Sequence, residues 1–305
     1  MPDENGKFKK FLSFGAGVQT TAMVLIPEIM NEVDEVIFSD TGGEHPETYE
    51  FLEKYTKPYL ESIGKPLVTV RMHNKLKDYA TGEYVEVTSL RDAVLAKHQI
   101  PNMFTRWCTA YSKVMPIIEY LRKKQTEGVY AKPAIGYLGI SIDEAERQFV
   151  ASHPEYSNYY PLIHMNISRD DCKDIIRKHG WGVPVKSGCY YCPFQGAKEW
   201  RHLYNTHPDL FQDSIMLEEQ DKGFPKFTLN ASGIKLRDMG ENFAKPSIDS
   251  FTSTELEEGE GCLGLACEID ETTIEGSLGY LVDTKKVAEI PIGGDKNGRT
   301  KAGSE

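Results

Sequence analysis

The sequence lacks the features of a membrane or secreted protein. No apolar run reaches the length that crosses a bilayer, and residues 1–6 carry no secretion-type apolar stretch. We therefore expect a cytoplasmic protein with no membrane partner. Cysteine is also scarce, with six residues in 305. In a reducing compartment such cysteines bind metals, react as thiols or fill the core more often than they form disulfides.

Basic charge is in short supply as well. The chain has 35 Lys and Arg residues against 46 Asp and Glu, and much of the acidic excess lies in residues 255–305. The sequence therefore lacks the broad basic surface that is typical of nucleic-acid-binding proteins. A local basic groove is still compatible with this composition. From residue 252 onward, a composition rich in Glu, Gly, Ser and Thr predicts a weakly ordered acidic segment.

What the chain does have is a regular alternation of apolar strands and helices. In the later part of the chain, helices are expected at 89–98, at 109–124, at 168–179 and from about 197. Such an alternation predicts an α/β fold with a doubly wound parallel sheet, which binds ligands at the carboxyl ends of its strands. The first elements are expected at 8–14 (strand), 20–32 (helix, broken at Pro27), 34–40 (strand), 45–64 (helix), 65–72 (strand) and 133–140 (strand).

The central feature is the small-residue turn at 13–21, between the first strand and its helix. Its backbone N–H groups and the helix N-terminus converge on one point, which is a ready site for phosphate. The turn matches neither the lysine-bearing P-loop nor the Gly-x-Gly-x-x-Gly fingerprint. Taken alone, Gly15 and Gly17 would serve a plain tight turn equally well.

A second feature is the Cys-x-x-Cys-Pro knuckle formed by Cys189 and Cys192. Two thiolates at this spacing can grip one metal centre, and Cys108 and Cys172 are the nearest candidates to complete it. Four such ligands suit zinc or a [4Fe–4S] cluster. Cys172 is equally compatible with an ordinary core position, because isoleucines follow it on the same predicted helix. We assign no role to the two cysteines at 262 and 267.

Three segments together resemble a known family. Residues 14–21 resemble the Ser-Gly-Gly-x-Asp-Ser pyrophosphate loop of the adenine-nucleotide alpha-hydrolase superfamily, with Gln19 at the aspartate and Thr20 at the last serine. Residues 40–48 resemble the Asp-Thr-Gly-x-x-x-Pro-Glu-Thr segment of phosphoadenylyl-sulfate (PAPS) reductases. Residues 139–147 resemble the Gly-x-Arg-x-x-Glu-x-x-x-Arg segment of the same group. The resemblance extends over about residues 10–205.

The resemblance implies a Rossmann-like fold that binds an adenine nucleotide, either ATP or PAPS. The loop and its threonines would hold phosphate, residues 40–43 would meet ribose and base, and Arg147 would neutralise negative charge. Gln19 lacks the carboxylate that would hold Mg²⁺, so the part played by magnesium stays open. The implied nucleotide-binding residues are Ser13, Gly15, Ala16, Gly17, Val18, Gln19, Thr20, Thr21, Asp40, Thr41, Gly42, Gly139, Glu144 and Arg147.

The cysteine motifs resemble the branch that includes DNA-phosphorothioation sulfurtransferases. Arg-x-Cys-Thr stands at 106–109, and Lys-Ser-x-Cys-x-x-Cys-Pro at 186–193. This likeness implies a [4Fe–4S] cluster, with zinc as the alternative. The Glu-Cys-Gly-x-His motif that carries the catalytic cysteine of PAPS reductases is absent from the sequence. The implied metal ligands are Cys108, Cys172, Cys189 and Cys192.

Two functions fit these features. One is a PAPS-reductase-like sulfurtransferase or oxidoreductase whose sulfur acceptor is a small molecule or a nucleic acid. The other is a non-catalytic nucleotide-binding partner or sensor subunit with a structural metal. The sequence leaves the oligomeric state open. We expect three parts: a nucleotide-binding α/β domain at 8–165, a helical cluster-binding subdomain at 166–250, and the acidic segment at 251–305.

Overall fold

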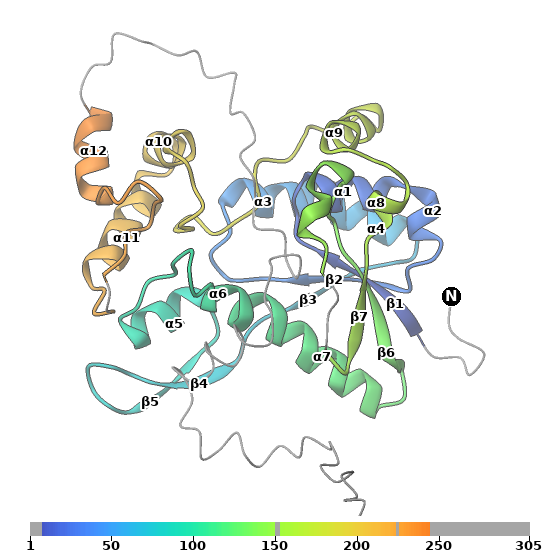
Figure 1. The fold of residues 1–305 in the computed structure, drawn as a ribbon, viewed down its shortest axis with the longest axis horizontal. Coiled ribbons are helices and arrows are strands. Elements are labelled where there is room, and N and C mark those ends of the chain that lie inside the picture. Colours follow the sequence, from blue (N-terminus) through green and yellow to red (C-terminus); the bar gives the residue numbers. More distant parts are fainter. Residues whose placement is uncertain (1–7, 150–152, 224–225, 245–305) are drawn as a thin grey trace, which may run out of the picture.

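A five-stranded parallel sheet forms the centre of the fold (Figure 1). The structure, a computed structural model, describes residues 8–149, 153–223 and 226–244. The spatial order of the strands is β3-β2-β1-β6-β7, and every neighbouring pair is parallel. The predicted α/β class with a parallel sheet is therefore confirmed. The strands are β1 (Phe8–Phe14), β2 (Glu35–Ser39), β3 (Leu67–Val70), β6 (Tyr130–Tyr137) and β7 (Tyr156–Tyr159).

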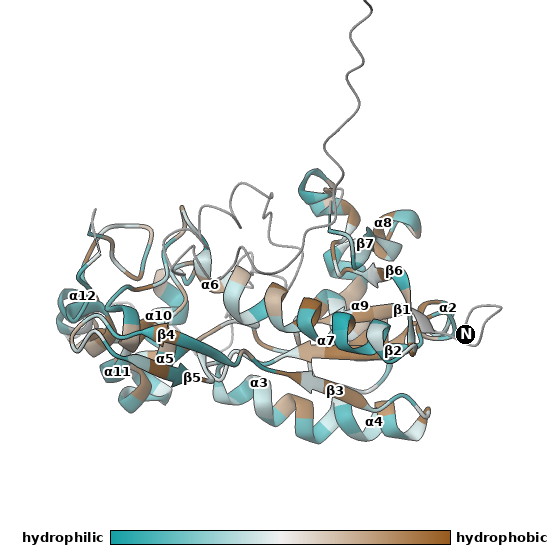
Figure 2. Cartoon of the chain, turned by 90° about the horizontal axis from the view of Figure 1, so that it is seen from below, coloured by the Kyte–Doolittle hydropathy of each residue, from teal (hydrophilic) through white to brown (hydrophobic). Residues whose placement is uncertain are grey.

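Helices cover both faces of the sheet. Successive side chains of a strand point to opposite faces, so Phe11 and Leu12 of β1 enter two different apolar clusters. Leu12 packs with residues of α1 (Val18–Leu25), whereas Phe11 packs with residues of α7 (Met115–Thr126). Because both faces of the sheet are buried, the sequences of its strands are nearly continuous apolar runs. In Figure 2 the strands β2 and β3 of this sheet are mostly brown, and helices such as α7 alternate brown and teal.

The remaining elements surround this sheet. Figure 1 shows the last three helices gathered beside one another at one end of the molecule, away from β7. No helix in the described part of the chain is long and apolar enough to cross a membrane. The other elements are α2 (Pro27–Met30), α3 (Pro46–Phe51), η1 (Leu52–Thr56), α4 (Lys57–Ser62), β4 (Asn74–Lys77), β5 (Tyr84–Val87), α5 (Leu90–Lys97), α6 (Trp107–Thr109), η2 (Ala110–Val114), η3 (Ile142–Arg147), α8 (Pro161–His164), α9 (Arg169–Lys178), α10 (Ala197–Thr206), α11 (Pro208–Glu219) and α12 (Leu236–Ala244).

Local sequence signals placed several boundaries correctly. The first helix breaks before Pro27, because the residue before a proline is driven out of the helical region, and Ile26 is extended with φ −92° and ψ 109°. Helix α9 starts after Ser168. The Ser168 hydroxyl accepts a hydrogen bond from the Asp171 backbone, and the Asp171 carboxylate accepts one from the Ser168 backbone. This capping box fixes the start of α9.

Other elements were not predicted from the sequence. The antiparallel β4–β5 hairpin, β7, α8, α11 and α12 all fall where the apolar pattern is weak. Helix α12 depends on a distant partner, since buried Glu218 of α11 accepts a hydrogen bond from the backbone of Leu236. Helix α9 lies beyond the expected boundary at 165, yet it packs against α1 on the sheet. The predicted acidic segment at 251–305 lies outside the described residues.

Candidate functional site

The candidate site lies where the chain changes direction across the sheet. From central β1 the chain runs to β2 and β3 on one side, and later to β6 and β7 on the other. Loops that leave the carboxyl ends of β1 and β6 diverge at this switch point, which is the usual ligand crevice of such sheets. The two loops are in contact: a Cβ atom on Gly139 would lie 2.6 Å from Thr20 Cγ2 and 3.2 Å from Thr20 N. Only glycine fits this close approach.

The loop after β1 is a tightly wound turn that ends in the first turn of α1. Ala16 adopts a left-handed conformation with φ +56°, and Gly17 caps the helix in extended geometry. Thr20 Oγ1 donates a hydrogen bond to Gly17 O at 3.3 Å. Thr21 Oγ1 is buried and has no hydrogen-bond partner in the described part of the chain. The turn therefore presents a helix N-terminus together with one unused hydroxyl.

Gln19 is fully buried, and both the nitrogen and the oxygen of its side-chain amide make hydrogen bonds. Nε2 donates to Glu144 Oε2 at 2.9 Å, and Oε1 accepts from Arg169 Nη1 at 3.2 Å. Nε2 also lies 3.5 Å from Ser141 Oγ. Arg147 Nη1 in turn donates to Glu144 Oε1 at 2.7 Å. The residue at the position of the loop aspartate is thus fixed within a network that links α1, η3 and α9.

Asp40, at the end of β2, holds the neighbouring loop in place. Its buried carboxylate accepts hydrogen bonds from Arg71 Nε at 2.9 Å, from Tyr49 OH at 2.7 Å and from Gly42 N at 2.8 Å. Burial, reinforced by the Asp40 carboxylate, raises the pKa of Tyr49 well above its ordinary range. Asp40 therefore shapes the loop through protein contacts. The contact of residues 40–43 with ribose and base stays a prediction.

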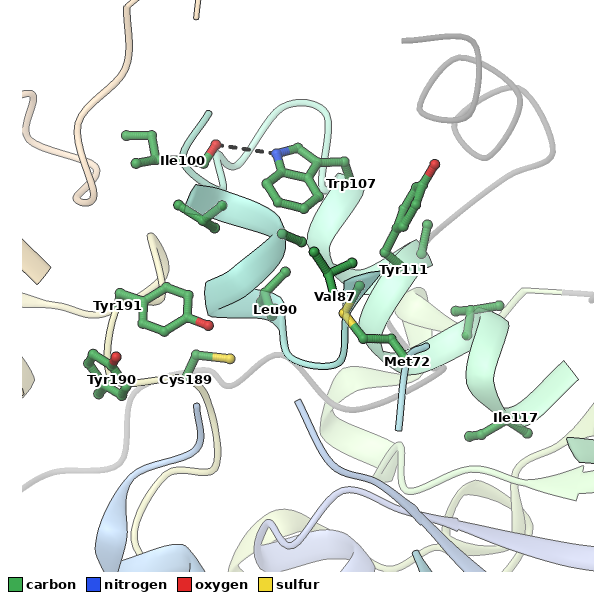
Figure 3. Close-up of a cluster of buried hydrophobic side chains, with 14 of the residues drawn as sticks. Met72, Val87, Leu90, Ile100, Trp107, Tyr111, Ile117, Cys189, Tyr190 and Tyr191 are labelled. Carbon is green, nitrogen blue, oxygen red and sulfur yellow. Dashed lines mark hydrogen bonds between the residues drawn. The ribbon is translucent and has the colours of Figure 1, made fainter. Parts of the chain in front are cut away.

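The cysteine knuckle is joined to this second loop by backbone hydrogen bonds. Glu44 and Cys189 form an antiparallel bridge, and Tyr190 N donates to Gly43 O at 2.9 Å. Thr41 Oγ1 donates to Glu44 Oε1 at 3.0 Å and lies 3.2 Å from Cys189 Sγ. Figure 3 shows Cys189, with Tyr190 beside it, on the border of the buried cluster. The knuckle is therefore attached to the loop that follows Asp40.

Three thiols, one buried and two half-buried, lie near one ammonium group. Cys108, Cys189 and Cys192 all influence Lys113, which lies on the π-helical turn η2. Burial raises the pKa of each thiol, that of Cys192 to about 11. Burial alone would lower the pKa of Lys113, but Glu44 and the three sulfurs outweigh it and raise that pKa. The Lys113 ammonium is therefore favoured by the negative charge of Glu44 beside it.

Cys172 does not join the other three. It lies on α9 with Ile176, one helical turn away, and both are fully buried in the apolar cluster that contains Leu12. Burial raises the pKa of Cys172 to about 12. Within residues 8–149, 153–223 and 226–244, no group of three or more His, Cys, Asp or Glu residues is arranged to hold a metal ion. The predicted four-cysteine centre, iron–sulfur or zinc, stays a prediction.

Histidines connect the helical end of the molecule to α3. His202 Nε2 and His207 Nε2 lie 3.2 Å and 2.9 Å from the same oxygen of Glu47, Oε1. His45 is buried and lies 3.0 Å from Gln195 Oε1 through its Nε2 atom. Burial lowers the pKa of His45. These contacts tie α10, α11 and the knuckle to the loop that follows Asp40.

Comparison with known proteins identifies the first half of the described chain. Residues 9–131 match the family model of the phosphoadenosine phosphosulfate reductase domain. This segment belongs to the PAPS-reductase-like family. It contains the turn at 13–21, called the phosphate loop here because it is predicted to bind phosphate. It also contains the loop that follows Asp40, together with Cys108 and Lys113. The resemblance of residues 14–21 and 40–48 to this family is therefore confirmed, whereas residues 139–147 and the cysteine knuckle lie outside the matched segment.

Two individual proteins are similar to the chain that carries this PAPS-reductase-like domain. An uncharacterized protein of Methanocaldococcus jannaschii is 32% identical over 206 residues, which cover 65% of this chain and 45% of that protein. The chain thus spans less than half the length of this relative. A phosphoadenylyl-sulfate (PAPS) reductase from Candida auris, solved as a phosphate complex, is 16% identical with a TM-score of 0.36. That match covers 58% of this chain and 75% of the reductase chain.

The structure adds residues to the site that sequence motifs did not single out. Arg169 reaches the phosphate loop from α9, and Arg71 pairs with Asp40 from the end of β3. The one local signal for Arg169 was its place directly after the capping serine of α9. Trp200, which follows the knuckle on α10, is fully buried against Phe211 and serves packing.

Proposed function

We propose that the PAPS-reductase-like domain binds the phosphate end of an adenine nucleotide, ATP or PAPS, at the β1–α1 loop, and that the protein is an enzyme of sulfur transfer or reduction. The observation that carries the proposal is the contact between this loop and the segment after β6, at the switch point of the sheet. The family match of residues 9–131, which contain this loop, supports a nucleotide as the ligand.

The residues divide into three roles under this proposal. The amides of the first turn of α1 and the hydroxyls of Thr20 and Thr21 hold phosphate oxygens, since a helix N-terminus favours anions. Arg147 supplies a positive charge. The thiol of Cys189 is joined to the nucleotide loop through Thr41, so sulfur chemistry takes place beside the bound nucleotide.

An iron–sulfur centre remains a prediction of the family resemblance, and no step of the proposal depends on it. Three thiols lie near one another around Lys113, while the fourth expected ligand lies in another cluster. Iron and acid-labile sulfide in anaerobically purified protein would support a cluster, and one zinc ion per chain would exclude it. Replacement of Cys189 and Cys192 by serine then tests whether the knuckle holds the metal.

Nucleotide binding is tested by thermal unfolding of the full chain with ATP, PAPS or adenosine 3′,5′-bisphosphate, and with GTP as a control. A ligand that binds only the folded state at 100 times its Kd stabilises the protein by about 2.7 kcal/mol. We expect adenine nucleotides to raise Tm. If no adenine nucleotide shifts Tm at millimolar concentration, the proposed function is wrong.

A pair of threonine variants locates the binding site. Thr21→Val removes a buried hydroxyl that has no partner in the described part of the chain, so we expect stability to be nearly unchanged while nucleotide affinity falls. Thr56→Val is the matched control, because its hydroxyl is also buried and without a described partner, but it lies on η1. Equal affinities of the two variants would place the phosphate elsewhere.

A non-catalytic nucleotide sensor or partner subunit is the second candidate. It is favoured by Gln19, which holds no metal as a carboxylate would, and by the missing catalytic-cysteine motif of PAPS reductases. Turnover separates the two functions. Consumption of ATP or PAPS in the presence of a thiol reductant supports an enzyme. Tight binding without consumption of either nucleotide supports the sensor.

A further inference from the structure

Tyr190 lies inside the cysteine knuckle and is held at each of its polar atoms. Its N–H donates to Gly43 O at 2.9 Å, and its carbonyl oxygen accepts from Gln195 Nε2 at 2.8 Å. Its side chain is buried, and the hydroxyl donates to Asp213 Oδ2 at 2.6 Å. Figure 3 shows Tyr190 beside Cys189 on the border of the buried cluster. The position of Tyr190 therefore sets the course of the main chain between the two cysteines of the knuckle.

Asp213 is itself fixed by an ion pair between two helices. Arg91 of α5 donates to Asp213 of α11 twice, from Nε to Oδ2 at 2.8 Å and from Nη2 to Oδ1 at 2.6 Å. Such a bidentate pair fixes the plane of the carboxylate. The hydrogen bonds from Arg91 hold the pKa of Asp213 below its ordinary value, so an ionised acceptor faces the Tyr190 hydroxyl. Tyr190 is thus linked to α5 as well as to α11.

The start of α5 is tied in turn to the loop that follows Asp40. The N–H of Leu90 donates to Thr41 O at 2.9 Å. Gly42 has φ +72°, and a Cβ atom there would lie 2.8 Å from Cβ of Ser89, the N-cap residue of α5. Because only glycine fits both this backbone conformation and this close approach, the loop and the start of α5 are in tight contact.

These contacts form a closed circuit around the knuckle. The loop after β2 holds α5, Arg91 of α5 holds Asp213, and Asp213 holds Tyr190, whose N–H returns to that loop. The same loop places Thr41 Oγ1 3.2 Å from Cys189 Sγ. Side-chain networks of this kind can stabilise an arrangement by more than the sum of their separate bonds. The ion pair therefore lies at one end of a chain of contacts whose other end is the Cys189 thiol.

We propose that Asp213, held by Arg91, is a positioning residue for the knuckle. Through Tyr190 it fixes the main chain that carries Cys189 and Cys192, and so keeps the Cys189 thiol against the loop after β2. The inference rests on the proposed sulfur chemistry beside the nucleotide, to which it adds a pair of residues from α5 and α11. Because the pair acts through Tyr190, its loss changes how the knuckle thiols react without removing any of them.

The test measures how fast iodoacetamide labels each thiol in the folded full chain after reduction, by peptide mass spectrometry. The labelling rates of Cys189 and Cys192 are divided by that of Cys108, which lies on α6 outside the knuckle. Loosening of the whole protein raises all three rates together and leaves this ratio unchanged. Release of the knuckle alone raises the ratio, so the readout separates positioning from general stability.

Two hydroxyl deletions give the decisive comparison. Tyr190→Phe should raise the labelling ratio by about fivefold or more, because the knuckle loses a hydrogen bond to a charged acceptor. Tyr111→Phe is the matched control, since its hydroxyl is buried in the same apolar cluster but has no hydrogen-bond partner in the described part of the chain. Each change removes one oxygen atom, so we expect both proteins to fold. Equal ratios in the two variants would overturn the inference.

Variants of the ion pair test the route through Asp213. Asp213→Ala should raise the labelling ratio, whereas Glu219→Ala on the same helix should not, because Glu219 lies in an exposed pair with Arg237. Exchange of the two charges, Arg91→Asp with Asp213→Arg, restores an ion pair, but an arginine at that position accepts no hydrogen bond from Tyr190. We therefore expect the exchange to recover stability in urea and not the ratio. Recovery of the ratio as well would contradict the role given to Tyr190.

The labelling ratio also separates this inference from the proposed function. An unchanged ratio in Tyr190→Phe, in a protein whose Tm rises with adenine nucleotides, rejects the positioning role alone. A raised ratio in a protein that no adenine nucleotide stabilises supports the positioning role and rejects the proposed function.

Discussion

The contact between Gly139 and the first turn of α1 allows a quantitative prediction. In Gly139→Ala the new methyl group would lie 2.6 Å from Thr20 Cγ2, 3.2 Å from Thr20 N and 3.4 Å from Gln19 Cβ. A side-chain methyl can rotate away, but the Thr20 backbone nitrogen belongs to α1 and moves only with the helix. We therefore expect the loop after β6 and the phosphate loop to separate by several tenths of an ångström.

The expected cost follows from the overpacking of a buried contact. Inserting a methyl group into a well-packed site destabilises a protein by about 1–3 kcal/mol. For a chain of this size, that corresponds to a fall in Tm of roughly 2–5 °C. If the amides of the first turn bind phosphate, the same displacement weakens nucleotide binding, by about tenfold for each 1.4 kcal/mol lost.

Thermal unfolding and nucleotide titration of two variants provide the assay. The matched control is Gly182→Ala, because a methyl group at Gly182 meets no heavy atom within 4 Å. We expect the control to be as stable as the unmodified protein, or more stable by up to about 1 kcal/mol through restriction of the unfolded chain. If Gly139→Ala and Gly182→Ala unfold at the same temperature and bind nucleotide equally, the contact is not the constraint that we infer.

Three further predictions concern buried groups. Arg71→Ala leaves the Asp40 carboxylate buried without its ion pair and should cost about 1–3 kcal/mol in urea unfolding, more than Arg177→Ala does; equal costs would contradict it. Burial lowers the pKa of His45, so the unfolded chain takes up the proton first, and stability should fall as pH drops below about 6.5; the slope between pH 6.5 and 5 should flatten in His45→Gln, and an unchanged slope would argue against this origin. Cys172→Ser should destabilise the protein more than Cys172→Ala, because it buries a hydroxyl in an apolar cluster; the reverse order of urea midpoints would show that packing is not its role.

Much of the fold could be read from local patterns. The break at Pro27 and the capping box at Ser168 each depend on residues within one turn, and both appear where the sequence places them. The strands β1 and β2 were predictable because both of their faces are buried. Helix α12 was not, since its start depends on a hydrogen bond to Glu218, 18 residues away.

The candidate site was predictable only in part, for the same reason. The phosphate loop is a local motif, whereas the partners of Gln19 lie 125 and 150 residues further along the chain. The cysteines show most clearly that spacing along the chain does not predict which residues meet in space. Spacing suggests that Cys172 belongs with the knuckle, but the apolar stripe of α9 turns it toward α1 and the sheet.

The sequence by itself determined the family and the parallel α/β class, because each depends on short runs of residues or on the periodicity of apolar side chains. It also predicted a phosphate-binding turn at 13–21. The tertiary structure alone decided what surrounds that loop. It gathers three of the four cysteines near Lys113, and it closes the chain of hydrogen bonds from Arg147 to Arg169 through Gln19. Such contacts depend on how helices pack across the sheet, a long-range property that no local pattern encodes.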